Sequence, residues 1–473
     1  MDTYTPRLIH TPKRLTVNTG PKPKMASIEE VANSGALSQI LGAHLFESID
    51  SGCDFQTHHR HHHRHRPRRS PNRSSHATPL TPGAPVQSVD FVGEIKHLEQ
   101  SDVVVLLVTF ASPTHHTLRL LLKHVDLPSQ QARIDKTPEK WAISVQSFQN
   151  EYDFFGRGAA MDDRGELASI MGIAAGLSLP RCYYRSRFPA DERLPMQRST
   201  LLLEYLAPEE YEQHQDLTLA QVKEALGALA QFHAFYWEDD GPLQDSTGMK
   251  RRLFERGGWW RAELRPSVKF DTIVASFESL CATFPAEFAD INNAESRALL
   301  GKLQAHYRQL GQQLRAKGSR TLMHGDCKTS NLFFRRGGGG DCTLIDFQWT
   351  GAASSGGGDV AYLLWSGVEP AAIVGAGQEA ALLDYYYEAL MTAMPGNEGR
   401  YTRAEFQHDY ELEFLDVFKT CLPQLLNGLT PADCRVHYGE FGWLTHEYHP
   451  AVTRAFVGRA LAALRSWDPN AQV

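Results

Sequence analysis

The stretch Thr321-Leu-Met-His-Gly-Asp-Cys-Lys-Thr-Ser-Asn331 and the later Leu344-Ile-Asp-Phe-Gln348 are the most informative parts of this chain. The first has the form H-G-D-x-x-x-x-N, and the second is an apolar run that ends in I-D-F-Q. An H-G-D triplet alone occurs in many proteins as an ordinary turn. The full set is far more specific, because an aspartate, an asparagine five residues later and a second aspartate after an apolar run occur together.

Short strands are expected around these motifs. Residues 321–324, 331–335 and 342–345 are apolar runs of strand length, and the glycines of 337–340 form a turn between the last two. This hairpin would place Asp346 at the end of its second strand, near the loop that carries the first motif.

The polar residues of the two stretches suit phosphoryl transfer. That reaction needs a carboxylate that orients the attacking hydroxyl and accepts its proton, oxygen ligands for Mg²⁺ on the nucleotide phosphates, and cations that offset the charge of the transferred group. Asp326 suits the first role. Asn331 and Asp346 offer the amide and carboxylate oxygens that Mg²⁺ accepts, with phosphates and waters completing its shell.

The sequence resembles the kinase-like small-molecule phosphotransferases, a group that includes aminoglycoside phosphotransferases and choline kinases. Within that group it is most similar to the CHK-kinase-like, ecdysteroid kinase-like branch. The resemblance extends over about residues 90–425 and is carried by six segments: His324-Gly-Asp326, Asn331-Leu-Phe-Phe334, Ile345-Asp-Phe-Gln348, Asp359-Val-Ala-Tyr-Leu363, Leu229-Ala-Gln-Phe-His-Ala234 and Asp384-Tyr-Tyr-Tyr-Glu-Ala-Leu390.

The resemblance implies roles for residues of the catalytic loop. Asp326 would be the catalytic base, and Asn331 and Asp346 would be the Mg²⁺ ligands. Lys328 would neutralise charge on the γ-phosphate, with a solvated lysine as the alternative. His324 is interpreted as a structural residue that positions the loop.

The resemblance also implies nucleotide-binding residues in the first part of the chain. Lys123 would hold the α- and β-phosphates of ATP, oriented by Glu151 on a helix expected over 143–155. We expect this pair to lie at an exposed sheet edge, where an ion pair contributes little stability and serves mainly to position the lysine.

Glu204-Tyr-Leu206 follows an apolar strand and resembles the hinge whose backbone groups bind adenine; a simple domain linker is the alternative. The chain has no clear G-x-G-x-x-G, and Val92-Gly-Glu94 is the candidate phosphate loop. Asp359 follows three glycines and precedes an apolar helix, so we expect it to be an N-cap, and the resemblance implies that it also steadies the catalytic loop.

Three differences from the wider superfamily limit which class of acceptor molecule is expected. Gly325 stands where protein kinases have an arginine that reads a phosphorylated activation loop, and only about a dozen residues separate Asp346 from Asp359. A small-molecule acceptor is therefore favoured over a protein. Gln348 stands where choline kinases tend to have glutamate, which weakens a choline assignment.

Aromatic side chains are the candidates for an acceptor pocket. These are Trp349, Tyr362, Trp365 and Trp443, although core packing is the favoured interpretation of each.

The 473 residues have an ordinary globular composition, with 42% hydrophobic and 22% charged residues, so a large core is possible. A strand-rich first part and a helix-rich second part predict an α+β protein-kinase-like fold of two lobes, with a small antiparallel-sheet N-lobe and a larger, mostly helical C-lobe. The expected layout is a disordered basic tail over 1–24, an N-lobe over 25–206, a disordered His/Arg/Pro-rich insert at about 56–88, and a C-lobe over 207–473 with the catalytic loop at 321–348.

Charge and cysteine content exclude some classes of protein. The net charge is −7, and because the tail and the insert are basic, the remainder is strongly acidic, which argues against nucleic-acid binding. No apolar run reaches the ~20 residues of a membrane helix. The 7 cysteines form no C-x-x-C pair, which favours a reducing compartment and a cytoplasmic protein.

These patterns together favour an ATP- and Mg²⁺-dependent O-phosphotransferase that acts on the hydroxyl of a small organic molecule. The alternative is a catalytically weak pseudokinase that serves as a nucleotide-binding module. A protein kinase is a third and less favoured possibility.

Overall fold

The computed structural model describes residues 86–97, 101–110, 117–128, 137–155, 177–188, 196–238, 253–337, 340, 342–394, 399–432 and 449–471. The expected tail at 1–24 lies outside these residues, and so does the expected insert apart from 86–88. Those three residues begin the first strand, so the insert ends before them.

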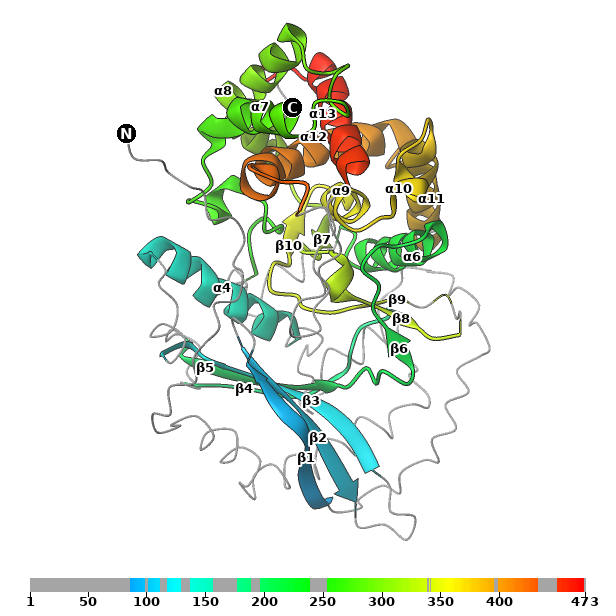
Figure 1. The fold of residues 1–473 in the computed structure, drawn as a ribbon. Coiled ribbons are helices and arrows are strands. Elements are labelled where there is room, and N and C mark those ends of the chain that lie inside the picture. The colour runs from blue at the N-terminus through cyan, green and yellow to red at the C-terminus, as the bar shows by residue number, and fades with distance from the viewer. Residues whose placement is uncertain are drawn as a thin grey trace.

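A five-stranded antiparallel sheet forms one end of the molecule (Figure 1). Its strands are β1 (Val86–His97), β2 (Asp102–Phe110), β3 (Thr117–Asp126), β4 (Cys182–Phe188) and β5 (Arg198–Glu204), in the order β1-β2-β3-β5-β4. Because β3 is the central strand, side chains of its second half are buried on both faces, and its Leu-rich sequence meets that demand.

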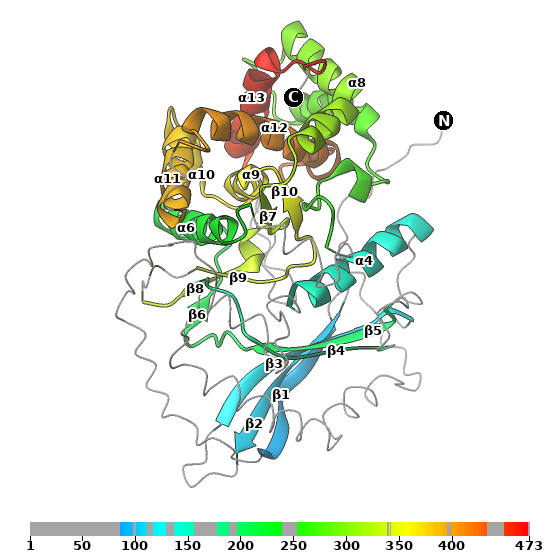
Figure 2. The same ribbon diagram turned by 180° about the vertical axis from the view of Figure 1, so that it is seen from behind.

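Helix α4 (Pro138–Phe155) crosses this sheet on the side that faces the helical part of the chain (Figures 1 and 2). It begins five residues before the expected start, because Pro138 suits the first helical position and the N–H of Trp141 already bonds to the carbonyl of Thr137. Its last nine residues are nearly all buried, including Glu151.

Helices make up most of the rest of the described chain (Figure 2). A large apolar core joins them, rich in Phe, Tyr and Trp. The main helices are α6 (Leu219–Phe235), α7 (Ile273–Thr283), α8 (Ala294–Ala316), α9 (Gly357–Ser366), α10 (Pro370–Ile373), α11 (Gln378–Ala393), α12 (Arg403–Cys421) and α13 (Pro450–Ser466).

Two small sheets carry the segments of most chemical interest between the large sheet and the helices. The expected hairpin is β8 (Leu332–Arg335) with β9 (Cys342–Leu344), and β6 (Tyr211–Glu212) adds to its edge. Strand β7 (Thr321–Met323) pairs with β10 (Gly351–Ala353), a strand that the sequence did not predict. The two ends of the catalytic segment are therefore joined side by side.

No helix among the described residues is long and apolar enough to cross a membrane. The five cysteines within the same ranges are all free and buried.

Candidate active site

The loop after β7 carries Asp326, whose side chain is almost fully buried at 5% exposure. Both described contacts of its carboxylate use Oδ2. The Nζ of Lys328 lies 3.0 Å from this oxygen, and the Nδ2 of Asn331 donates to it at 3.2 Å and to the Asp326 carbonyl at 2.8 Å. The three residues are thus in direct contact, and Oδ1 of Asp326 makes no hydrogen bond within the described part of the chain. The charge of Asp326 also raises the pKa of Lys328, which keeps the ammonium protonated.

Asp359 holds the backbone of this loop. Its Oδ2 accepts a hydrogen bond from the His324 N–H at 2.6 Å, and its Oδ1 accepts one from the Gly325 N–H at 2.8 Å. The expectation that Asp359 is an N-cap is wrong, because α9 already begins at Gly357 with Gly356 as its cap. Asp359 lies in the first turn, and its buried carboxylate faces the catalytic loop.

The pKa of Asp359 is set by opposing effects. Burial alone would raise it, but hydrogen bonds and the nearby imidazoles of His233 and His324 hold it below its usual range. The ring of His233 is 3.1 Å from Asp359 Oδ2 through Nε2 and 2.7 Å from the Tyr386 hydroxyl through Nδ1. Because a carboxylate only accepts, Nε2 carries the proton in this pair.

Gly325 is the point where the catalytic loop meets two other segments. Its φ of +83° is left-handed, and a Cβ there would come 2.1 Å from the carbonyl oxygen of Trp349 and 2.7 Å from the N–H of Gly258. Only glycine fits both restrictions. The imidazole of His324 bonds to the carbonyl of Ile345 at 2.8 Å, so it positions the loop, which matches its structural interpretation.

Asp346 lies beside Asn331. The N–H of Ile345 donates to the carbonyl of Asn331 at 3.0 Å, which brings the two segments together. Asp346 has a φ of +66°, a left-handed conformation that a non-glycine residue adopts rarely and often at functional sites.

Lys123 and Glu151 form the predicted ion pair. The Nζ of Lys123 is 2.7 Å from Oε2 of Glu151 and 3.6 Å from Oδ1 of Asp346. The expectation of an exposed sheet edge is wrong. Because β3 is the central strand, Lys123 is only 8% exposed and Glu151 3%.

Burial changes how this pair titrates. It would lower the pKa of Lys123, but the carboxylates of Glu151 and Asp346 outweigh that effect and leave the pKa raised. The pKa of Glu151 is also raised, because burial outweighs the attraction of Lys123. The lysine therefore stays protonated.

The end of α4 packs directly on the segment that carries Asp346. The ring of Phe154 stacks on that of Phe347 with centroids 3.9 Å apart, and Phe155 meets Phe347 edge-on at 5.7 Å. Asn150 donates from Nδ2 to the carbonyls of Phe347 at 3.0 Å and Thr350 at 2.8 Å. Glu151 is thus fixed relative to Asp346 by its neighbours along the helix.

The candidate hinge and the candidate phosphate loop belong to the large sheet or follow it directly. Glu204 ends β5, and its backbone N–H donates to the carbonyl of Arg181 at 2.7 Å, so this N–H is occupied. Leu206 follows the strand and is partly buried. Val92–Glu94 do not form a loop. They lie within β1, next to an irregular register between Val92 and Lys96.

Two of the four candidate pocket aromatics line a cavity. Tyr362 and Trp365 project from α9 into a small, partly open cavity of about 50 Å³ between α9, α12 and α13. Trp349 stacks on Phe254 with centroids 5.7 Å apart. Trp443 lies outside the described residues.

Sequence reasoning missed the segment Leu253–Arg265, which hydrogen-bonds to the catalytic loop. The N–H of Gly258 donates to the carbonyl of Trp349 and that of Trp259 to the carbonyl of Gly325, each at 3.0 Å. The only signal in the sequence is the dipeptide Gly257-Gly258 before two tryptophans. Asn150 was missed as well, since nothing distinguishes it from a surface residue until the helix is packed.

Residues 166–395 match the profile of the ecdysteroid kinase-like family. This part of the chain is similar to that family. The family lies within the protein-kinase-like superfamily, which confirms the resemblance noted from the catalytic loop. No curated protein matches the chain.

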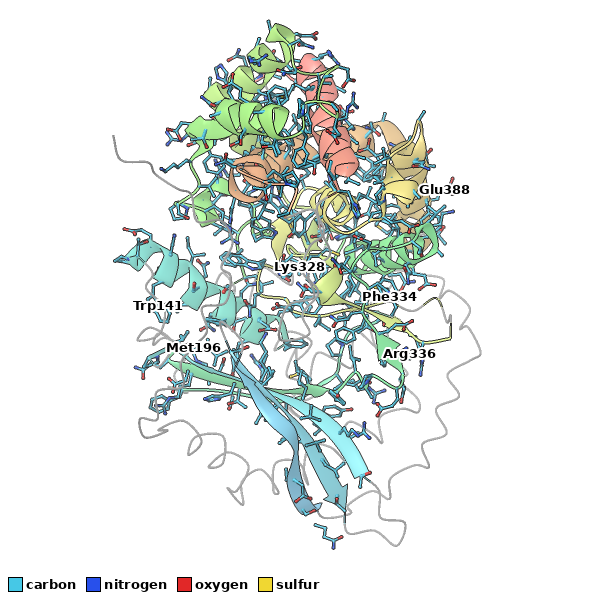
Figure 3. All side chains as sticks on the ribbon, viewed as in Figure 1. Trp141, Met196, Lys328, Phe334, Arg336 and Glu388 are labelled. Carbon is cyan, nitrogen blue, oxygen red and sulfur yellow. The ribbon has the colours of Figure 1, made fainter. Side chains whose placement is uncertain are left out.

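The ecdysteroid kinase-like match covers Glu204, Asp326, Asn331 and Asp346. It begins at residue 166, after Lys123 and Glu151. Those two residues join the matched segment through the buried ion pair with its 3.6 Å approach to Asp346. Figure 3 shows Lys328 in the same central region, between the large sheet and the helices.

The matched site suits a magnesium ion. Among the described residues, no cluster of three His, Cys, Asp or Glu side chains forms a metal cage. Oδ1 of Asp346 is buried without a hydrogen-bond partner, although Lys123 lies nearby, and Asn331 adds an amide oxygen. An orphaned carboxylate oxygen with few other protein ligands fits Mg²⁺, which keeps most of its shell for phosphates and water.

Proposed function

We propose that this protein transfers the γ-phosphoryl group of ATP to a hydroxyl of a small organic molecule. One observation carries the proposal: the Nζ of Lys123 contacts both Glu151 and Asp346, which come from distant parts of the chain. A buried lysine between two carboxylates, next to a loop with Asp326 and Asn331, fits phosphoryl transfer better than a structural role, because burying the charges of Lys123 and Glu151 costs stability.

ATP would bind between the large sheet and the helical part, which would act as the two lobes of a kinase-like enzyme dividing near residue 206. Lys123 would hold the α- and β-phosphates. The backbone from Glu204 to Leu206 would bind adenine, chiefly through groups after Glu204, whose own N–H is already bonded within the sheet.

Asp346 and Asn331 would hold Mg²⁺. When bound, the ion would offset charge on the phosphates and fix their orientation. Asp346 follows β9 in a left-handed conformation, and the backbone bond from Ile345 to Asn331 holds the segments of the two proposed ligands together.

Asp326 would orient the acceptor hydroxyl and take its proton through Oδ1, since Lys328 and Asn331 already occupy Oδ2. Lys328 would then offset charge on the transferred group. The chain itself therefore contributes position and charge, and no covalent intermediate is needed.

A small acceptor is favoured by the short segment between Asp346 and Asp359. The cavity beside α9 is the candidate acceptor region. Gly367, which lines it, packs so closely on Thr329 of the catalytic loop that a Cβ would come 2.3 Å from the threonine methyl group. An acceptor bound there would lie close to Asp326.

Binding of Mg²⁺-ATP, measured by thermal shift, tests the proposal. Wild type should melt higher with Mg²⁺-ATP, because a ligand that binds only the folded state stabilises it. Asp346→Asn should lose most of this shift, whereas Asp384→Asn, at an exposed ion pair, should keep it.

Turnover is then measured as ADP release with pools of hydroxyl-bearing metabolites. No shift at millimolar Mg²⁺-ATP would overturn the nucleotide site. A shift without ADP release from any pool would favour the pseudokinase alternative.

A further inference from the structure

Arg265 lies beside the catalytic loop with its guanidinium between two indole rings. Its Cζ is 4.9 Å from the ring centroid of Trp259 and 4.6 Å from that of Trp349. Both distances fall within the range of a cation–π contact, and arginine stacks on aromatic faces in this way. The side chain follows a short 3-10 helix, Ala262–Leu264, and is partly buried.

The two indoles are themselves fixed to the catalytic segments. The backbone of Trp259 bonds to Gly325, next to Asp326, and the backbone of Trp349 bonds to Gly258. Trp349 is also stacked on Phe254 at an interplanar angle of 10°. The guanidinium is therefore held at a defined place relative to Asp326.

The charge of Arg265 has no described partner. No hydrogen bond or ion pair joins its side chain to another residue within the described ranges, and its Nε is buried without an acceptor. The buried Arg261, four residues earlier, pairs with both Glu413 and Asp416. The same segment thus supplies one arginine that is fully neutralised and one that is not.

Arg265 remains a cation at neutral pH. Burial lowers its pKa to about 10, against the attraction of Asp326 and Tyr362. Asp326 and Lys328 both lie close enough to interact with it electrostatically. One carboxylate is therefore flanked by two cations, of which only Lys328 is paired with it directly.

We propose that Arg265 binds the non-bridging oxygens of the transferred phosphoryl group and of the phosphate monoester product. This inference rests on the proposed function. In the reaction, the acceptor oxygen bonds to the γ-phosphorus, the bond from that phosphorus to the β–γ bridging oxygen breaks, ADP leaves with the electron pair, and the hydroxyl proton passes to Asp326. The arriving phosphoryl group brings negative charge next to a carboxylate, and a planar guanidinium with free N–H groups binds such oxygens well.

Inorganic phosphate is the probe for this site. In the absence of nucleotide, phosphate should raise the melting temperature of wild type, and Arg265→Gln should weaken phosphate binding about tenfold or more. The matched control is Arg335→Gln, which removes an arginine stacked on Tyr211 away from the site and should leave phosphate binding unchanged. Arg265→Lys keeps the charge without the planar fork and should retain part of the binding, which covers the case in which Arg265→Gln does not fold.

A second binding experiment shows whether Arg265 binds the transferred phosphoryl group or an anionic group of the acceptor. If phosphate occupies the position of the transferred group, it should bind together with Mg²⁺-ADP and be excluded by Mg²⁺-ATP, whose γ-phosphoryl group competes for the same cations. Phosphate binding that Mg²⁺-ATP leaves unchanged would place Arg265 at an anionic group of the acceptor instead and would overturn the proposal.

Two other results would also overturn it: no phosphate binding by wild type, or equal binding by wild type and both Arg265 variants. Failure of the proposed function is distinct, because it appears as the absence of any shift with Mg²⁺-ATP or Mg²⁺-ADP.

Discussion

Asn150 on α4 donates a hydrogen bond from its side-chain amide to the backbone carbonyl of Thr350, a residue 200 positions further along the chain. The same amide donates to the carbonyl of Phe347, and its oxygen accepts from the N–H of Phe254 at 2.8 Å. One fully buried side chain therefore joins the helix of Glu151, the segment after Asp346 and the segment that carries Arg265. These hydrogen bonds fix the positions of the three segments that carry the proposed site residues.

Replacing Asn150 should destabilise the protein and separate these three segments. Asn150→Ala leaves the Thr350 carbonyl and the Phe254 N–H buried without partners, and the Phe347 carbonyl keeps only its bond from the Thr350 N–H, so we expect a loss of about 3 kcal/mol in the free energy of unfolding. Gln149→Ala is the control, because Gln149 bonds only to Asp153 on its own helix among the described contacts. Chemical denaturation measures both. Equal losses in the two variants would mean that the junction contributes nothing specific.

Asp326→Asn should abolish turnover and keep nucleotide binding. The amide cannot accept the hydroxyl proton, and such a group contributes about 10²–10⁴-fold to the rate. ADP release with an active acceptor measures the loss, and the thermal shift with Mg²⁺-ATP should stay close to that of wild type. A variant that retained turnover would remove Asp326 from the mechanism.

Lys123→Met should destabilise the protein by about 3–5 kcal/mol near neutral pH, because it leaves Glu151 as an unpaired buried charge. Lys123→Met with Glu151→Leu should recover much of that loss, since no buried charge remains.

The loss in Lys123→Met should also depend on pH. Burial already raises the pKa of Glu151, and removing Lys123 removes the main opposing effect. A carboxyl whose pKa is higher in the folded state than in the unfolded state lowers the stability of the protein as the pH rises. The loss begins near the unfolded-state pKa of about 4.3. In denaturation curves, the free energy of unfolding of Lys123→Met should therefore be closer to that of wild type at pH 5 than at pH 8. A difference that did not change with pH would contradict this account of Glu151.

Gly325→Ala should be far more harmful than an alanine at another left-handed glycine. The left-handed conformation alone costs a non-glycine residue about 1–3 kcal/mol. At Gly325 the Cβ would also overlap the carbonyl of Trp349. Gly318→Ala is the matched control, because its φ is +73° and nothing lies within 4 Å of its Cβ position. The difference in melting temperature between the two variants measures the overlap, and similar values would mean that the catalytic loop moves aside.

Residues that act through local sequence were predictable. The H-G-D-x-x-x-x-N loop, the hairpin and the second aspartate are close in sequence, so their spacing alone brings Asp326, Asn331 and Asp346 together. The pairing of Lys123 with Glu151 was also predicted, because a strand lysine and a helix carboxylate match a known arrangement. The burial of Lys123 and Glu151 was not predicted. It depends on β5, which follows much later in the chain and pairs with β3 so that β3 becomes the central strand.

Sequence by itself thus determined the motifs of the catalytic loop, the similarity of residues 166–395 to the ecdysteroid kinase-like family and the α+β class. Tertiary structure alone decided two other links between distant segments: Asn150 with Thr350, and Arg265 with Trp259 and Trp349. The reason is physical. Spacing along a chain fixes contacts within a loop, a hairpin or a helix turn, whereas contacts between segments depend on how their apolar faces pack. An arginine without an ion-pair partner beside the carboxylate of Asp326 can be recognised only once its neighbours are in place.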